Sequence, residues 1–413
     1  MRIATHRAPH LVFGEHEFDV PLDHESPERG KLTVFAREVV SPDKETDELP
    51  WLVFFQGGPG SESPRPLALV DKTWLARALE DYRVLLLDQR GTGRSTPVGD
   101  LDGMSAEEQA EYLTHFRADS IVRDAELIRH QLGAHEWSVL GQSFGGFCVV
   151  TYLSQAPEGL TAAFLTGGLP PLDRHADDVY RATYERTIAK NHAYYERYPE
   201  DRERVTAILE RLDAEDVRLP GGDRLTLRRF RQLGHVLGMG DGFERLHYIL
   251  ELPFGSRAFL HDIERVDPFS RNPIYAVIHE ACYSSGAVSR WSAERLFPDE
   301  FRDDPTLLTG EHVFPWMFEE YGELRALAGA AEILAEHEWP ELYDVERLRE
   351  NGVAAAAVIY AEDMYVVRQF SEETAASIRG LRPWLTNEYE HDGLRQEGGR
   401  VLGRLIDLVQ GRA

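Results

Sequence analysis

A serine flanked by glycines is the clearest candidate for chemistry in this sequence. Residues 141–145 read GQSFG, a G-x-S-x-G pattern centred on Ser143. The pattern lies between a short apolar run at 137–140 and a segment of helical length that ends at Pro157. In a tight strand-to-helix turn the serine hydroxyl projects away from the backbone, and glycines flank it because a Cβ there would clash. The placement favours a nucleophile over the alternative, an ordinary glycine-rich turn.

A serine hydroxyl is a weak nucleophile, so a base and an orienting carboxylate are needed. In this arrangement the chain order is serine, acid, histidine. Asp363 follows the apolar run at 353–360, with Glu362 as its neighbouring competitor. His391 comes after the last candidate strand and before the last candidate helix. The alternative for Asp363 is a solvated loop carboxylate. The alternative for His391 is that one of the sixteen histidines falls late in the chain by chance. The order of these residues in the chain, and the position of each after a candidate strand, predict a triad of Ser143, Asp363 and His391.

The negative oxygen formed during acyl transfer needs two backbone N–H donors. One comes from the residue after the nucleophile, which is Phe144. The other is expected from the loop after an early strand, and the segment QGGPG at 56–60 follows the apolar run WLVFF. Because glycine permits a close backbone approach, Gly58 is the predicted second donor, and a plain tight turn is the alternative.

Strands that alternate with helices must position these groups. Runs at 10–24 and 31–40, joined by SPERG, predict an antiparallel hairpin at a sheet edge. Further strands are expected within 51–55, 82–88, 137–141, 160–168, 353–363 and 383–393, and helices within 66–80, 120–133, 142–157 and 399–408. This alternation predicts right-handed crossovers and an α/β fold with a mostly parallel twisted sheet flanked by helices.

The middle of the chain has a different pattern. From about 170 to 350 it consists of long, polar-rich helical stretches with few strand candidates. We therefore expect a catalytic domain formed by 1–169 and 351–413, with a helical lid at 170–350 inserted between its strands. A length of 413 residues fits this division, because single cores rarely exceed about 250 to 300 residues.

Composition excludes several classes of function. A formal net charge of -26 disfavours nucleic acid and anionic lipid, and no apolar stretch approaches the length of a membrane helix. The acidity is interpreted as a solvated surface rather than as a site for a cationic substrate. The first residues lack a signal peptide pattern, which predicts a cytoplasmic location. Cys148 and Cys282 have no zinc spacing and are expected to be inert buried thiols.

Four motifs, in order, give the chain a family resemblance. QGGPG, DQRGTGRS, GQSFGG and TNEYEHDGLR resemble the proline iminopeptidases, in their longer bacterial form, within the α/β-hydrolase superfamily. Many relatives have histidine where Gln56 stands, which leaves the Gly58 backbone donor unaffected. The resemblance implies release of an unblocked N-terminal proline from peptides through a prolyl ester on Ser143. It implies neither a metal nor an organic cofactor.

The resemblance also implies residues that bind the substrate. In this family lid glutamates bind the free amine, and the matching positions are Glu280 and Glu311, with Glu319 or Glu320 as substitutes for Glu311. Such carboxylates would form charge-assisted hydrogen bonds to a prolyl amine, which is a cation near neutral pH. The pocket for the proline ring is expected from Leu169, Tyr283 and Phe314. Lid ion pairs and simple core packing are the alternative roles of these residues.

Two other functions fit parts of the pattern. The same triad could serve an esterase or another lidded hydrolase that acts on a neutral small substrate. A binding or scaffold protein of this fold would normally have lost a triad residue, and all three are present. Arg90 and Arg94, in DQRGTGRS, are expected to brace their loop rather than contact substrate. The number of subunits is left open.

Overall fold

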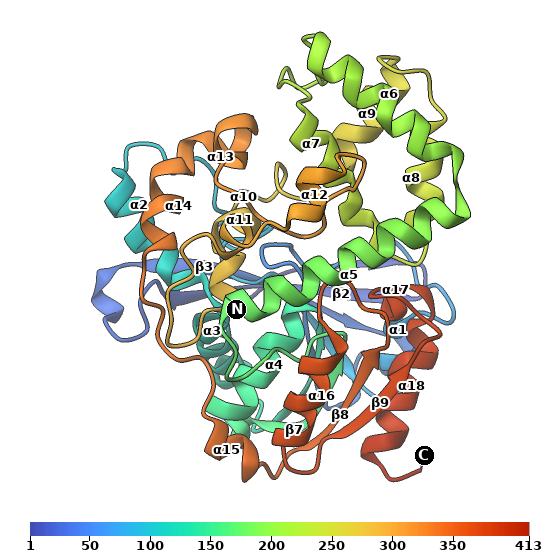
Figure 1. Ribbon diagram of the computed structural model, residues 1–413. Coiled ribbons are helices and arrows are strands. Elements are labelled where there is room, and N and C mark those ends of the chain that lie inside the picture. The colour runs from blue at the N-terminus through green and yellow to red at the C-terminus, as the bar shows by residue number, and fades with distance from the viewer. Residues whose placement is uncertain (413) are drawn as a thin grey trace.

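A mostly parallel sheet forms the centre of the molecule (Figure 1). The computed structural model describes residues 1–412. Within them the sheet has nine strands in the order β1-β2-β3-β5-β4-β6-β7-β8-β9. The pairs from β5 through β9 are parallel, whereas β1, β2 and β3 pair antiparallel at one edge. The strands are β1 (Arg2–Ala8), β2 (Leu11–Pro21), β3 (Lys31–Val40), β4 (Trp51–Phe55), β5 (Arg83–Leu87), β6 (Trp137–Gln142), β7 (Leu160–Thr166), β8 (Ala354–Tyr360) and β9 (Arg382–Thr386).

The antiparallel edge is larger than the sequence predicts. The expected hairpin is present as β2 and β3, and β1 pairs with β2 as an additional edge strand. β1 escapes prediction because it is exposed almost throughout and therefore lacks the apolar alternation of a half-buried strand.

Helices cover both faces of the sheet and bury a separate apolar cluster on each. α1 and α18 contact each other and cover one face, while α3 and α4 pack together on the other. The helices outside the inserted region are α1 (Trp74–Ala78), α2 (Ala106–Leu113), α3 (Ala118–Gln131), α4 (Phe144–Gln155), α16 (Arg368–Ser377), α17 (Gly393–Gln396) and α18 (Gly398–Val409).

The expected helix at 66–80 is much shorter in the structure. Only Trp74–Ala78 is α-helical, because the Thr73 side chain caps that helix by accepting a hydrogen bond from the Ala76 N–H at 3.2 Å. The residues before it, including Pro64 and Pro66, form an irregular loop. This loop lies beside the candidate site described below.

The region between β7 and β8 is helical and lies above the sheet in Figure 1, apart from α15, which packs against α4. Its strand pairing, within the described residues, consists of two isolated bridges. Its helices are α5 (Ala176–Arg197), α6 (Glu200–Ala214), α7 (Leu227–Arg231), α8 (Gly242–Leu250), α9 (Arg257–Val266), α10 (Pro273–Ile278), α11 (Ser292–Arg295), α12 (Asp299–Asp303), α13 (Met317–Glu320), α14 (Ala328–Ala335) and α15 (Val345–Arg349). Among residues 1–412, no helix is both long enough and apolar enough to cross a membrane.

Candidate active site

Ser143 lies in the turn that joins β6 to α4. Its φ of 54° is in the left-handed region that L side chains rarely adopt. Neighbouring glycines make the turn possible: a Cβ on Gly141 would overlap the carbonyl of Gly145, and one on Gly145 would overlap the carbonyl of Phe55. The serine is therefore held in a strained turn directly against the end of β4, as the sequence pattern predicts.

His391 and Asp363 lie together at the same edge of the sheet. The Nδ1 atom of His391 is 2.7 Å from Oδ2 of Asp363, and both side chains are buried. The other carboxylate oxygen of Asp363 accepts hydrogen bonds from the N–H groups of Tyr365, at 2.9 Å, and Val366, at 3.0 Å. Glu362 instead points to the lid and forms an ion pair with Arg186. The structure thus brings Asp363, and not its neighbour, to the histidine.

The electrostatics of His391 suit a general base. Burial alone would lower the pKa of His391, but the charge and hydrogen bond of Asp363 outweigh it and hold that pKa above its usual value. With Nδ1 bonded to Asp363, the Nε2 atom remains for a substrate or nucleophile. Ser143 and His391 line the same cavity.

The loop after β4 lies directly against the nucleophile. A Cβ on Gly57 would come 3.0 Å from both the Ser143 Cβ and the Gln142 carbonyl oxygen, so a larger residue there would press on the turn that carries the nucleophile. Gly58 has a φ of 132° and lines the cavities on both sides of Ser143. Its N–H and that of Phe144 remain the candidate donors to a negative oxygen.

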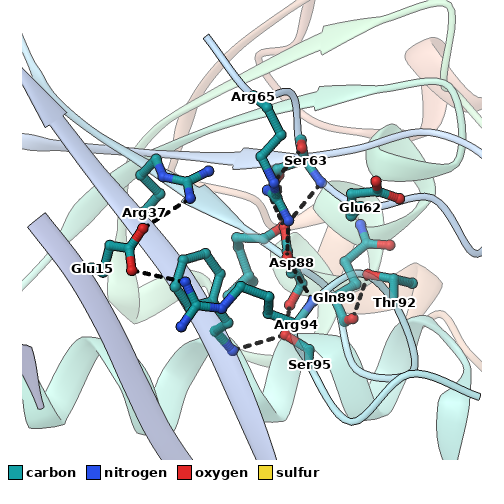
Figure 2. Close-up of polar contacts among 12 residues, drawn as sticks. Glu15, Arg37, Glu62, Ser63, Arg65, Asp88, Gln89, Thr92, Arg94 and Ser95 are labelled. Atoms are coloured by element: carbon teal, nitrogen blue, oxygen red, sulfur yellow. Dashed lines mark hydrogen bonds and ion pairs between the residues drawn. The ribbon is translucent and has the colours of Figure 1, made fainter. Parts of the chain in front are cut away.

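A buried carboxylate, Asp88, fixes this loop (Figure 2). It follows β5 and accepts hydrogen bonds from the Ser63 N–H at 3.2 Å, from the Arg94 N–H at 3.0 Å and from the Arg65 guanidinium. The Gln89 side chain donates to the carbonyl of Gln56 at 3.0 Å. Figure 2 shows these groups converging from separate segments, so the DQRGTGRS segment braces the loop that carries Gly58.

The two arginines of that segment act as expected from the sequence. The guanidinium of Arg94 lies 4.0 Å from the ring centroid of Phe35 and pairs with Glu15 and Glu17. Arg90 is fully buried and pairs with Asp124. Neither arginine lines a cavity at Ser143.

Two cavities meet at Ser143. A small one is lined by Phe144, Phe147, Cys282 and Tyr283, among others, and its volume of about 10 Å³ holds about one water. A prolyl ring would therefore have to move these side chains apart to enter. The second cavity is open, with a volume of about 770 Å³, and His391 lies in its wall.

Glu311 lines both cavities. Burial raises the pKa of its carboxyl group to about 8, so the carboxylate lacks a strong cationic partner. The Tyr275 hydroxyl donates a hydrogen bond to it, and His279 Nε2 lies 3.9 Å away. Burial lowers the pKa of His279 to about 3, which keeps that ring neutral. Glu311 is thus a largely buried acid beside Ser143.

Comparisons with known proteins identify the family of this chain. Residues 50–334 match the alpha/beta hydrolase fold family. A proline iminopeptidase of Aeromonas sobria is 49% identical over 95% of both chains. The proline iminopeptidase aneH of Aspergillus aculeatus is 34% identical over 96% of this chain and 94% of its own. The chain belongs to the proline iminopeptidase family. Among solved structures, a proline iminopeptidase of Mycobacterium smegmatis aligns over 96% of this chain and 98% of its own, with 12% identity and a TM-score of 0.47.

Membership in the proline iminopeptidase family confirms the fold and the resemblance predicted from the sequence. It also makes the protein a hydrolase and does not favour the esterase alternative.

The structure does not bring Glu280 to the site. Its carboxylate oxygens accept hydrogen bonds from the backbone N–H groups of Ser292, at 3.2 Å, and Ala293, at 3.0 Å, where α11 begins. Burial raises the pKa of Glu280. The side chain is absent from the walls of both cavities at Ser143. In this protein Glu280 binds the backbone N–H groups at the start of α11 and does not face Ser143.

Of the three residues predicted to form the pocket for the proline ring, only one lines a cavity at Ser143. Tyr283 lines the small cavity, where its ring packs edge-on against Phe147. Leu169 and Phe314 are buried core residues that line neither cavity at Ser143, because Phe314 packs against Phe297 and Trp316. Glu320, considered as a substitute for Glu311, pairs with Arg228.

Sequence reasoning missed several residues that line the site. Tyr275 contacts Glu311, and Phe147 and Cys282 line the small cavity. His235 lines the large cavity, and within residues 1–412 its buried Nδ1 has no hydrogen-bond partner. Burial, helped by the nearby His391, lowers the pKa of His235 to about 4. An aromatic or histidine among apolar lid residues has no distinctive spacing, so no sequence signal marks these positions.

Proposed function

We propose that this protein is a prolyl aminopeptidase that releases an unblocked N-terminal proline from peptides. Glu311 carries the proposal, because its largely buried carboxyl group, with a pKa of about 8, lines both cavities beside Ser143. A free prolyl amine is the cation that would stabilise its charged form. The names of the Aeromonas and Aspergillus relatives support the same activity.

In the proposed mechanism His391 accepts the proton of the Ser143 hydroxyl while the serine oxygen attacks the prolyl carbonyl carbon. The N–H groups of Gly58 and Phe144 hold the negative oxygen of the tetrahedral intermediate. The C–N bond then breaks and His391 gives its proton to the leaving amine. Water, activated by His391, hydrolyses the prolyl ester, which releases proline and restores the serine. Asp363 stabilises the imidazole of His391 in each step in which that ring carries the extra proton.

Binding of the amine by Glu311 would restrict cleavage to the first residue. The amine and the carbonyl of one prolyl residue are joined by a single carbon, so anchoring the amine places only that carbonyl at Ser143. A blocked N-terminus has no cation, and it would leave Glu311 without its partner. Glu311 lies in the region 170–350, which forms the proposed lid on a catalytic domain of residues 1–169 and 351–413.

A substrate panel tests this function. Prolyl and alanyl amides with a free amine, their N-acetyl forms and short acyl esters are compared by kcat/KM. We expect the unblocked prolyl amide to be preferred and its acetylated form to be inert. Efficient hydrolysis of the esters with no cleavage of prolyl amides would refute the aminopeptidase and favour an esterase.

The cytoplasmic location expected from the sequence also remains a proposal. Cys148 and Cys282 are both unpaired and buried, and unpaired thiols suit a reducing compartment. Fractionation of cells that produce the protein at its native level would test the location directly.

A further inference from the structure

We propose that the large cavity beside Ser143 binds the leaving part of the peptide and selects an apolar or aromatic residue directly after the N-terminal proline. The inference rests on the proposed function and adds a substrate preference to it. It assigns a specificity role to the loop between β4 and α1, chiefly to Leu67 and Val70.

The position of His391 decides which cavity receives the leaving chain. A general acid must lie beside the nitrogen that it protonates. His391 lines the large cavity and is absent from the walls of the small one. The amine of the substrate is assigned to Glu311 and its ring to the small cavity, so the chain after the scissile bond extends into the large cavity.

The wall of the large cavity is apolar. Pro66, Leu67, Val70 and Trp74 line it from the loop and the start of α1, and Met239 and Leu394 contribute from elsewhere in the chain. The Trp74 ring stacks on Phe54 with centroids 4.5 Å apart, which gives this wall a fixed base. A side chain that enters here contacts hydrocarbon on the loop side.

Leu67 and Val70 are 86% and 61% exposed, which is unusual for large apolar side chains. Both line the cavity. Exposed apolar groups that cluster at the mouth of a cavity indicate a binding surface, because a ligand that covers them removes their area from water. We assign the residue after proline to this surface.

Charge in the cavity points the same way. Besides His391, the charged side chains in its lining are Glu311, Asp392 and Arg395. Arg395 already pairs with Asp392 at 2.6 Å. An acidic side chain after the proline would therefore lose water without gaining an unpaired cation, and the net charge of -26 adds to its repulsion.

The test compares Pro-Phe, Pro-Leu, Pro-Gly and Pro-Asp amides by kcat/KM, with each value divided by that for Pro-Gly amide. This ratio does not depend on the fraction of active enzyme. We expect the phenylalanine and leucine substrates to exceed the glycine one about tenfold or more, since one apolar contact changes specificity by about 10- to 200-fold. The aspartate substrate should fall below glycine.

The double variant Leu67→Ser/Val70→Ser should reduce the Phe/Gly ratio of kcat/KM to within about threefold. Met104→Ser is the matched control, because Met104 is a 42% exposed apolar residue in another loop and lies outside the cavity. Its ratio should equal that of the unmodified protein. A ratio near one in the unmodified protein, or the same ratio in the double variant, would overturn the inference.

The result also separates this inference from the proposed function. Cleavage of all four amides at equal rates refutes only the preference for an apolar residue. Failure to cleave any of them, together with ester hydrolysis, refutes the aminopeptidase and the preference with it.

Discussion

Asp363 and His391 stand 28 positions apart in the chain, yet the Oδ2 atom of one lies 2.7 Å from the Nδ1 atom of the other. The second oxygen of Asp363 is held by two backbone N–H groups, so the carboxylate cannot rotate away. The backbone N–H of His391 donates to the lid carbonyl of Gly238 at 3.2 Å. Asp363 thus orients the imidazole, and Gly238 of the lid holds the backbone that carries it.

Replacing Asp363 by asparagine should lower kcat about 10⁴-fold. An amide at this position can donate to Nδ1 and would favour the tautomer that cannot accept the serine proton. Glu362→Gln is the control, since Glu362 is exposed and pairs with Arg186, and its kcat should stay within about twofold. Steady-state kinetics on a prolyl amide measure both. A loss of less than tenfold in the asparagine variant would remove Asp363 from the triad.

Activity should fall as the pH decreases through a value above 6.5. Asp363 holds the pKa of His391 above its usual value despite burial, so the ring gains its proton at a higher pH than an ordinary histidine. The protonated ring cannot accept the serine proton, and the base is present only above that pKa. The pH profile of kcat/KM from 5 to 9 checks this. A flat profile between pH 5 and 8 would contradict it.

Replacing Glu311 by glutamine should lower kcat/KM for unblocked prolyl amides about 10- to 100-fold, because a hydrogen bond to a charged group contributes about 1.5–3 kcal/mol. Hydrolysis of a short acyl ester is the control and should change little. Equal kinetics on the prolyl amide in variant and unmodified protein would show that Glu311 does not bind the amine.

Glu311→Gln should also change how stability depends on pH. The folded pKa of Glu311, about 8, lies above its unfolded value, so the folded protein loses stability as the pH rises from about 4.5 towards 8. Glutamine has no such dependence. The Tm of Glu311→Gln relative to the unmodified protein should therefore increase between pH 5 and pH 8. A difference in Tm that is constant across this range would contradict the raised pKa.

Glu280→Gln should lower stability and leave catalysis unchanged. The carboxylate of Glu280 accepts hydrogen bonds from the backbone N–H groups of Ser292 and Ala293, and loss of a hydrogen bond to a charged group costs about 1.5–3 kcal/mol. Chemical denaturation should detect this loss, while KM for a prolyl amide stays unchanged. A large rise in KM with unchanged stability would restore Glu280 to the amine site.

The sheet and the reacting groups could be predicted from sequence for a physical reason. Ser143, Asp363 and His391 each follow a strand, and the carboxyl ends of parallel strands meet at one edge of the sheet, so order and spacing locate them. β1 was missed because exposure removes its pattern, and the helix at 66–80 was overestimated because Thr73 sets its start.

The lid could not be predicted in the same way. Glu280 and Glu311 are both acidic residues within the mostly helical region 170–350, and the sequence does not distinguish them. Their difference arises from contacts across the lid: Glu280 meets the N–H groups that begin α11, whereas Glu311 meets Tyr275 and the cavities at Ser143. Such contacts depend on how helices pack, which no local pattern records.

The proposed mechanism requires the hydroxyl of Ser143 to become the acyl acceptor. Treatment with a fluorophosphonate followed by mass mapping of peptides tests it most directly. We predict a single adduct on Ser143 with loss of prolyl amide hydrolysis, and a Ser143→Ala variant that is unlabelled and about 10⁶-fold slower. Labelling of another residue while Ser143 stays free, or substantial hydrolysis by the alanine variant, would contradict the account.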